Sequence, residues 1–154
     1  MKRRNVALSA CILSIVCLMI ALSGCNTKST KAYSFNVDNG DKIKITLDTT
    51  GEYDLSSDLP FTVSMNGTTQ SQGTFIEADS FQQYLDVVNS DAKAELIDQG
   101  ERDDVKYIFW CYNSSEYNYA VLINDSKTGV IIGNIVSEGS AKACFDRLTF
   151  SCEN

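Results

Sequence analysis

Histidine is absent from the 154 residues of this chain. Ser-His-Asp and Cys-His catalytic arrangements are therefore excluded, because both use an imidazole as the general base. A zinc site would have to be built from thiolates and carboxylates alone, and no Cys-x-x-Cys pair occurs. We therefore expect neither a zinc site nor catalysis that depends on histidine.

Glycine-rich phosphate-binding loops are also missing. The nine glycines form neither Gly-x-Gly-x-x-Gly nor Gly-x-x-x-x-Gly-Lys-Ser/Thr, the motifs that place backbone amides around a phosphate. The run at residues 124–129 has too few carboxylates for an EF-hand calcium loop and lacks the closing glutamate. The sequence thus predicts no nucleotide, metal or other cofactor.

The first 24 residues have the order of a secretory signal peptide. Residues 2–4 form a basic tip, residues 6–22 are apolar apart from two serines, and the small residues Ser23 and Gly24 follow. A charged tip, a short apolar segment and small residues at the cleavage site are typical of exported proteins. We therefore expect residues 1–24 to be removed.

The stretch Leu22-Ser23-Gly24-Cys25 resembles the lipobox of bacterial lipoproteins at all four positions. The resemblance implies that the peptide is cut between Gly24 and Cys25 and that the Cys25 sulfur carries a thioether-linked diacylglycerol. Two acyl chains, at about 0.8 kcal/mol per buried CH₂, supply upwards of roughly 20 kcal/mol and anchor a protein stably. We therefore expect a lipid on Cys25 that holds the protein at the extracytoplasmic face of the cell membrane.

An uncleaved transmembrane helix is the alternative interpretation of the same residues. Residues 6–27 carry no charge and are just long enough to span a bilayer. Small residues followed by cysteine are not what a spanning helix needs at its outer end, so we favour the lipoprotein. Residues 25–31 are then a polar, flexible stalk, and residues 32–154 form a single domain.

The mature chain is strongly acidic. Removing residues 1–24 takes away three basic residues and no acidic one, so 13 Lys and Arg fall to 10 against 20 Asp and Glu, and the formal charge moves from −7 to −10. A field of this sign repels phosphate backbones and anionic headgroups. Nucleic acid is therefore not expected as a partner.

Three cysteines remain in the expected mature domain: Cys111, Cys144 and Cys152. Outside the cytoplasm a disulfide can form, but three thiols do not all pair within one chain. If one forms, Cys111 is the better partner for either of the others. Cys144 lies four residues before the predicted corner between helix and strand at Leu148, and Cys152 lies four residues after it. Four residues advance the chain by about 6 Å in a helix and by about 13 Å in a strand, so Cys144 and Cys152 tend to lie at different distances from the corner and not to meet.

Hydrophobic periodicity predicts an α+β domain. Alternating runs indicate strands at 33–37, 43–47, 61–65, 73–76, 94–97, 105–112, 117–123, 130–136 and 148–152. Residues 48–59 and 68–72 are expected to be loops. A helix capped by Asp79 or Ser80 should carry Phe81, Tyr84, Leu85 and Val88 on one face, and Ser140 should cap a short second helix.

The expected architecture is an antiparallel sheet with one medium and one short helix packed on it. From Pro60 to the end, this order of elements resembles the PsbP/Mog1-type fold, including the short closing helix and the strand at residues 146–151. The resemblance implies only a fold, because no signature motif accompanies it.

Aromatic residues concentrate in one predicted hairpin, which carries six of them between residues 107 and 119. Side chains alternate along a strand, so aromatic groups occupy both faces of the hairpin. One face should pack on the core. The other is either covered by a helix or exposed to contact a glycan, peptide or protein, and its candidate residues are Trp110, Tyr112, Tyr117 and Tyr119.

The leading functional hypothesis is a lipid-anchored, extracytoplasmic, non-enzymatic module that binds an envelope protein or glycan. The alternative is an envelope hydrolase that acts on cell-wall glycans with paired carboxylates. Its candidates lie in two acidic turns, one with Asp38 and Asp41 and one with Asp98, Glu101, Asp103 and Asp104. Acidic turns are usually solvated, which disfavours the raised pKa that an acid catalyst needs.

Overall fold

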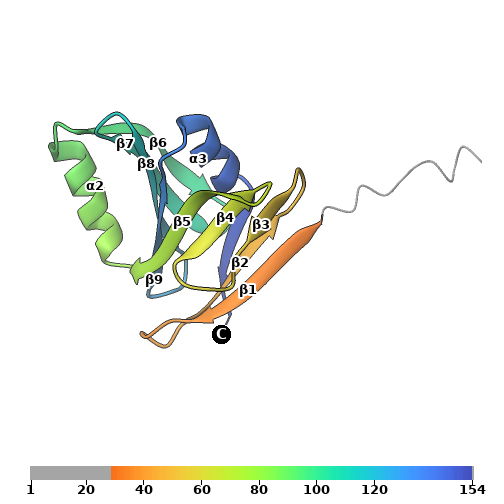
Figure 1. The fold of residues 1–154 in the computed structure, drawn as a ribbon. Coiled ribbons are helices and arrows are strands. Elements are labelled where there is room, and N and C mark those ends of the chain that lie inside the picture. Colours follow the sequence, from red (N-terminus) through yellow and green to blue (C-terminus); the bar gives the residue numbers. More distant parts are fainter. Residues whose placement is uncertain (1–28, 154) are drawn as a thin grey trace, which may run out of the picture.

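A computed structural model describes residues 29–153 of the chain as two antiparallel sheets and two helices. The predicted signal peptide, the lipobox and the first part of the stalk lie outside the described residues. The small sheet has the order β1-β2-β10, and the large sheet has the order β3-β4-β5-β9-β8-β7-β6 (Figure 1). The predicted α+β class is confirmed.

The small sheet is formed by β1 (Thr30–Asn36), β2 (Lys42–Asp48) and β10 (Leu148–Cys152). The large sheet contains β3 (Tyr53–Leu55), β4 (Phe61–Met65), β5 (Thr68–Glu77), β6 (Ala94–Arg102), β7 (Val105–Tyr112), β8 (Glu116–Ile123) and β9 (Thr128–Asn134). Helix α2 (Ser80–Ser90) follows β5, and helix α3 (Glu138–Phe145) follows β9.

The main core lies between the two sheets. The alternating Ile43, Ile45 and Leu47 of β2 are fully buried against large-sheet residues such as Phe61 and Phe109. Helix α3 closes the same layer with its buried Cys144 and Phe145. Period-2 alternation in β2 thus directs one apolar face inward, as its sequence predicts.

Helix α2 covers part of the opposite face of the large sheet. Its Val88 joins a second buried cluster with Ile108, Trp110 and Ala120, and the partly buried Phe81, Tyr84 and Leu85 pack against this cluster. The predicted apolar helix face is confirmed. Asp79 occupies the N-cap position, but its side chain makes no capping hydrogen bond.

Hydrogen bonds between two turns join the two sheets at one end. The β1–β2 turn contains Gly40 at φ 95°, and its Asn39 and Asp41 contact the β8–β9 turn. The Asp41 carboxylate accepts hydrogen bonds from the Lys127 amide at 2.7 Å and the Thr128 hydroxyl at 2.8 Å, while the Asn39 amide donates to the Thr128 hydroxyl at 3.0 Å. These bonds fix the small hairpin to the large sheet.

Several predicted boundaries are wrong in the first half of the domain. The expected loop at 48–59 contains β3, which pairs with β4. The expected loop at 68–72 belongs to β5, because Asn66 and Gly67 both adopt positive φ and form a two-residue turn that lets pairing resume at Thr68. The expected stalk ends before Thr30, where β1 begins.

Several later boundaries also differ. The strand expected at 130–136 is β9, which runs from Thr128 to Asn134 and leaves Ile135 and Val136 in the connection to α3. Helix α3 begins at Glu138, because the Ser137 hydroxyl accepts a hydrogen bond from the Ser140 amide and so takes the capping role predicted for Ser140. Strand β6 extends to Arg102 through an irregularity between Leu96 and Asp98. The expected single sheet is two sheets, and the likeness to the PsbP/Mog1-type fold stays a prediction.

Glycine at position 73 is required by close packing. A methyl group at Gly73 would overlap the ring of the fully buried Phe61, whereas a methyl group at Gly139 in α3 meets no atom within 4 Å. We expect Gly73→Ala to lower the free energy of unfolding by about 1–3 kcal/mol through overpacking. Gly139→Ala should be neutral or stabilising by up to about 1 kcal/mol. Urea unfolding of both variants checks this, and equal stabilities would contradict it.

Candidate binding site

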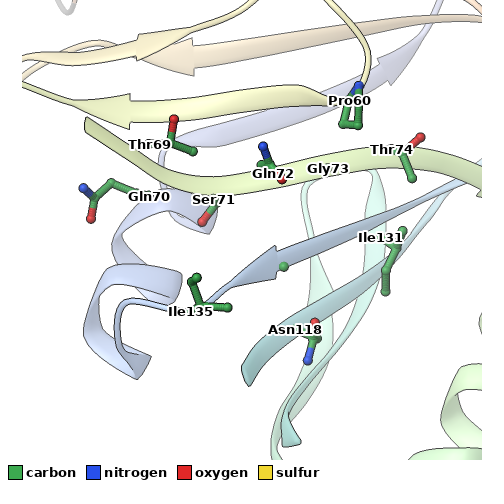
Figure 2. A pocket seen from close by; sticks show the side chains of 11 residues that line it. Pro60, Thr69, Gln70, Ser71, Gln72, Gly73, Thr74, Asn118, Ile131 and Ile135 are labelled. Atoms are coloured by element: carbon green, nitrogen blue, oxygen red, sulfur yellow. The ribbon is translucent and has the colours of Figure 1, made fainter. Parts of the chain in front are cut away.

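An open groove of about 580 Å³ lies on the outer face of the large sheet (Figure 2). It lies on the same face as α2, since Ile131 belongs both to the groove and to the cluster beneath the helix. The residues that line it are Pro60, Thr69, Gln70, Ser71, Gln72, Gly73, Thr74, Asn118, Ile131, Gly133 and Ile135. Its volume is within the range of ligand sites, about 300–1,000 Å³.

Among residues 29–153, none of those that line this groove is charged, although charged residues make up 21% of the chain. Three carboxamides lie along it, those of Gln70, Gln72 and Asn118, over a floor that includes Gly133 and Ile131. An amide both donates and accepts hydrogen bonds. The groove therefore suits an uncharged ligand that has hydrogen-bonding groups and an apolar side.

One end of the groove is held by a buried polar network. The Asn134 amide donates to the hydroxyls of Ser71 at 2.9 Å and Ser140 at 3.0 Å, and the Ser140 hydroxyl donates to the Gln70 carboxamide oxygen at 2.9 Å. Gln70 is thereby fixed in position. Gln72, in contrast, is exposed and makes no side-chain hydrogen bond to another described residue, so its amide is available to a ligand.

Exposed apolar side chains border the same end. Ile135 is 83% exposed and the adjacent Val136 is 55% exposed, in the connection between β9 and α3. Figure 2 shows Ile135 beside Gln70 and Ser71. Large apolar side chains at this exposure are typical of contact surfaces when they adjoin a groove.

The aromatic residues predicted as a binding surface do not form one. In the β7–β8 ladder Trp110 faces Asn118, whereas Cys111 faces Tyr117 and Phe109 faces Tyr119. Trp110 and Tyr112 therefore lie on the α2 side of the sheet, and Tyr117 and Tyr119 lie on the side of the main core.

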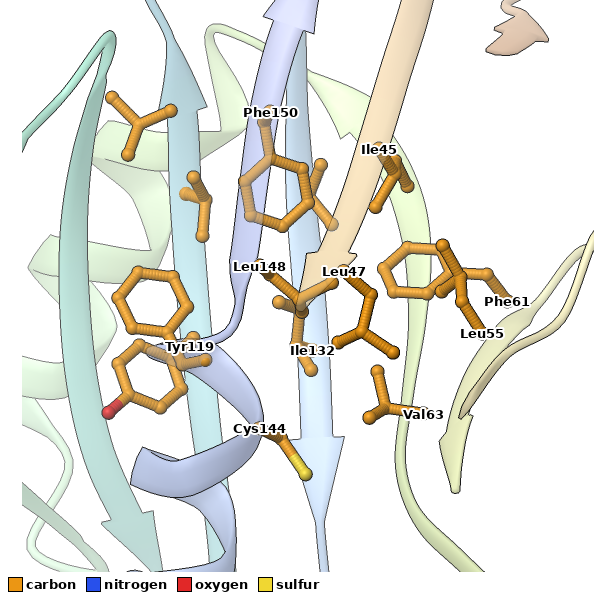
Figure 3. Packing of buried hydrophobic residues seen from close by; sticks show 14 of the residues in the cluster. Ile45, Leu47, Leu55, Phe61, Val63, Tyr119, Ile132, Cys144, Leu148 and Phe150 are labelled. Carbon is orange, nitrogen blue, oxygen red and sulfur yellow. The ribbon is translucent and has the colours of Figure 1, made fainter. Parts of the chain in front are cut away.

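Two of these four aromatic residues are buried. Trp110 is only 6% exposed, and the Tyr84 ring of α2 lies 5.9 Å from its ring. Of the two outcomes expected for this aromatic face, cover by a helix is therefore the one that applies to Trp110. Tyr119 is 4% exposed in the main core, where its ring stacks on Phe145 at 4.0 Å and on Phe109 at 4.2 Å (Figure 3). Burial contradicts a contact role for both.

The acidic turns are tied to neighbouring strands. Asp41 belongs to the contact between the two hairpin turns, and Asp98 accepts a hydrogen bond from the Tyr107 hydroxyl at 3.0 Å. Glu101 pairs with Lys106 at 3.2 Å. These contacts give the carboxylates structural partners on the surface.

A smaller cavity of about 230 Å³ places three carboxylates beside two arginines, with Asp48, Asp103, Asp146, Arg102 and Arg147 among its lining residues. Arg102 pairs with Asp146 at 3.1 Å. The same guanidinium donates to the carbonyl of Phe145 at the end of α3 and to that of Leu148 at the start of β10. Arg102 thus connects β6 to the start of β10.

Cys111 and Cys144 are buried free thiols, so neither takes part in a disulfide. Burial raises the pKa of the Cys144 thiol. Across residues 29–153 there is no group of three or more carboxylates and thiols arranged to hold a metal ion. Within the same residues, neither helix has the length and apolarity needed to cross a bilayer.

A scan against models of known protein families gives no match for this chain. A search of curated proteins likewise gives no match.

Burial of Tyr119 predicts a loss of stability at alkaline pH. Desolvation raises the pKa of the Tyr119 phenol far above its usual value of 10. Above pH 10 the unfolded chain releases this proton while the folded chain keeps it, so stability falls by about 1.4 kcal/mol per pH unit from this group. Tyr119→Phe should show a shallower decline in urea unfolding between pH 9 and about 11. Parallel profiles would contradict the assignment.

Proposed function

We propose that the protein is a lipid-anchored, extracytoplasmic, non-enzymatic binding module. The observation that carries this proposal is the tetrapeptide Leu22-Ser23-Gly24-Cys25, which stands only a few residues before the first strand at Thr30. A diacylglycerol on Cys25 would hold the domain at the outer face of the cell membrane.

The groove between β5, β8 and β9 supports the binding role. It combines a ligand-sized volume, an uncharged lining and an amide on Gln72 that is not used within the domain. Binding sites commonly join an apolar surface to a few placed polar groups. An uncharged segment of an envelope protein or a neutral glycan has the complementary chemistry. The carboxylate-based hydrolase stays a prediction, and no contact among its candidate carboxylates favours it.

Lipidation is tested by Cys25→Ala in the full chain, with Cys152→Ala as the matched control. Without the Cys25 sulfur no thioether can form, so the variant should lack the lipid mass and stay an uncleaved precursor that retains residues 1–24. Cys152→Ala should carry the lipid mass and lose residues 1–24, because its thiol lies in the last strand of the folded domain. A Cys25→Ala protein that is cleaved normally and carries the lipid mass would refute the anchor.

Binding in the groove is tested by site-specific photo-crosslinking in intact cells. A photoreactive residue replaces Gln72 in the groove, or Lys44 on the exposed side of the small sheet as the control. Discrete adducts are expected from position 72 and should be lost when Ile131→Lys places a charge in the groove. Equal adducts from both positions, or adducts that survive the added charge, would contradict the groove as the binding site.

A further inference from the structure

The first described residue, Ser29, lies very close in sequence to the predicted lipid-bearing residue. The Ser29 carbonyl accepts hydrogen bonds from the Thr49 amide at 2.8 Å and the Thr49 hydroxyl at 2.9 Å, so Ser29 is fixed to the loop that follows β2. Only Asn26, Thr27 and Lys28 lie between Cys25 and this point. The predicted stalk is therefore much shorter than the sequence pattern indicates.

This length of chain limits how far the domain can move from the bilayer. Four consecutive Cα–Cα steps separate Cys25 from Ser29, and a fully extended chain covers at most about 14 Å over that distance. Strand β1 alone has seven residues and is about 20 Å long. The tether is thus shorter than the hairpin to which it is attached.

Three segments surround the attachment point. Thr30 pairs with Asp48, which places the β2–β3 loop at residues 49–52 beside it. The Asp48 amide donates to the Arg147 carbonyl at 2.9 Å, which places the α3–β10 connection there as well. We call these segments, residues 29–30, 49–52 and 146–147, the tether end of the domain. The β1–β2 turn at residues 37–41 lies at the opposite end of the same hairpin (Figure 1).

Charges of both signs lie at and beside the tether end, including the carboxylates of Glu52 and Asp48. Lys31 pairs with Asp54 at 2.7 Å, and Arg102 pairs with Asp146 at 3.1 Å. The Arg147 guanidinium lies 4.3 Å over the Tyr53 ring and adds a further cation. Paired charges lower the electrostatic cost of approaching a headgroup layer, whereas the net acidity of the rest of the domain opposes close approach.

We propose that the tether end faces the headgroups of the bilayer and that the β1–β2 turn points away from it. This inference rests on the proposed lipid at Cys25. The groove opens on the outer face of the large sheet, which is the face opposite the small sheet that carries the tether.

The orientation is tested on the full-length lipidated protein in phosphatidylcholine vesicles that contain lipids with a quenching headgroup. A thiol-reactive fluorophore is attached through Thr50→Cys at the tether end or Asp38→Cys at the distal turn, both in a Cys152→Ser background. These positions differ in height by about 20 Å, so quenching at position 50 should exceed that at position 38 at least about twofold. A flexible spacer of about ten residues inserted before Ser29 should remove the difference.

The outcomes separate the orientation from the anchor. Stronger quenching at position 50 that disappears with the spacer supports the proposal. Equal quenching of the two probes in protein whose mass includes the lipid overturns the orientation and leaves the anchor in place. Absence of the lipid mass overturns both.

Discussion

The fold depends on the need to cover both faces of the large sheet. Strand β7 shows this constraint most directly, because its consecutive residues Ile108, Phe109, Trp110 and Cys111 are all buried. A strand that is apolar on both sides is stable only inside a layered structure. The small sheet and α3 supply one cover, and α2 supplies the other.

Coverage is incomplete on the α2 side, and the groove lies where it ends. Helix α2 spans 11 residues, or about 16 Å, and packs over Ile108, Trp110 and Ala120. The neighbouring surface of β5 and β9 carries Gln72, Thr74 and Gly133, which need no apolar cover. The polar sequence of β5 therefore keeps part of the sheet face open without exposing a large hydrophobic surface.

Sequence patterns determine most of this architecture but not its division into two sheets. Alternation identifies β2, and the 3.6-residue spacing of Phe81, Tyr84 and Val88 identifies α2, because each pattern reports one local face. The pairing of β10 with β2 joins residues about a hundred positions apart, and local periodicity contains no information about it. The hydrogen bond from the Thr128 hydroxyl to the Asp41 carboxylate likewise joins two turns that are far apart in the sequence.

The candidate site was harder to predict, because the relevant signal is an absence of charge. A cluster of aromatic residues in a sequence is consistent with a binding surface, but Trp110 and Tyr119 are buried and stabilise the packing on the two faces of the large sheet. Gln70 and Gln72 resemble an ordinary polar loop in the sequence, but the Asn66-Gly67 turn aligns them in β5. Residues 25–154 contain ten more acidic than basic residues, so a groove whose described lining residues are all uncharged differs electrostatically from its surroundings. Such a patch favours neutral ligands through desolvation, since an ion would lose hydration there without gaining a partner. Specificity would then come from hydrogen bonds to the carboxamides and from the fit of an apolar side against Ile131 and Ile135, while the acidic remainder of the domain repels anionic competitors.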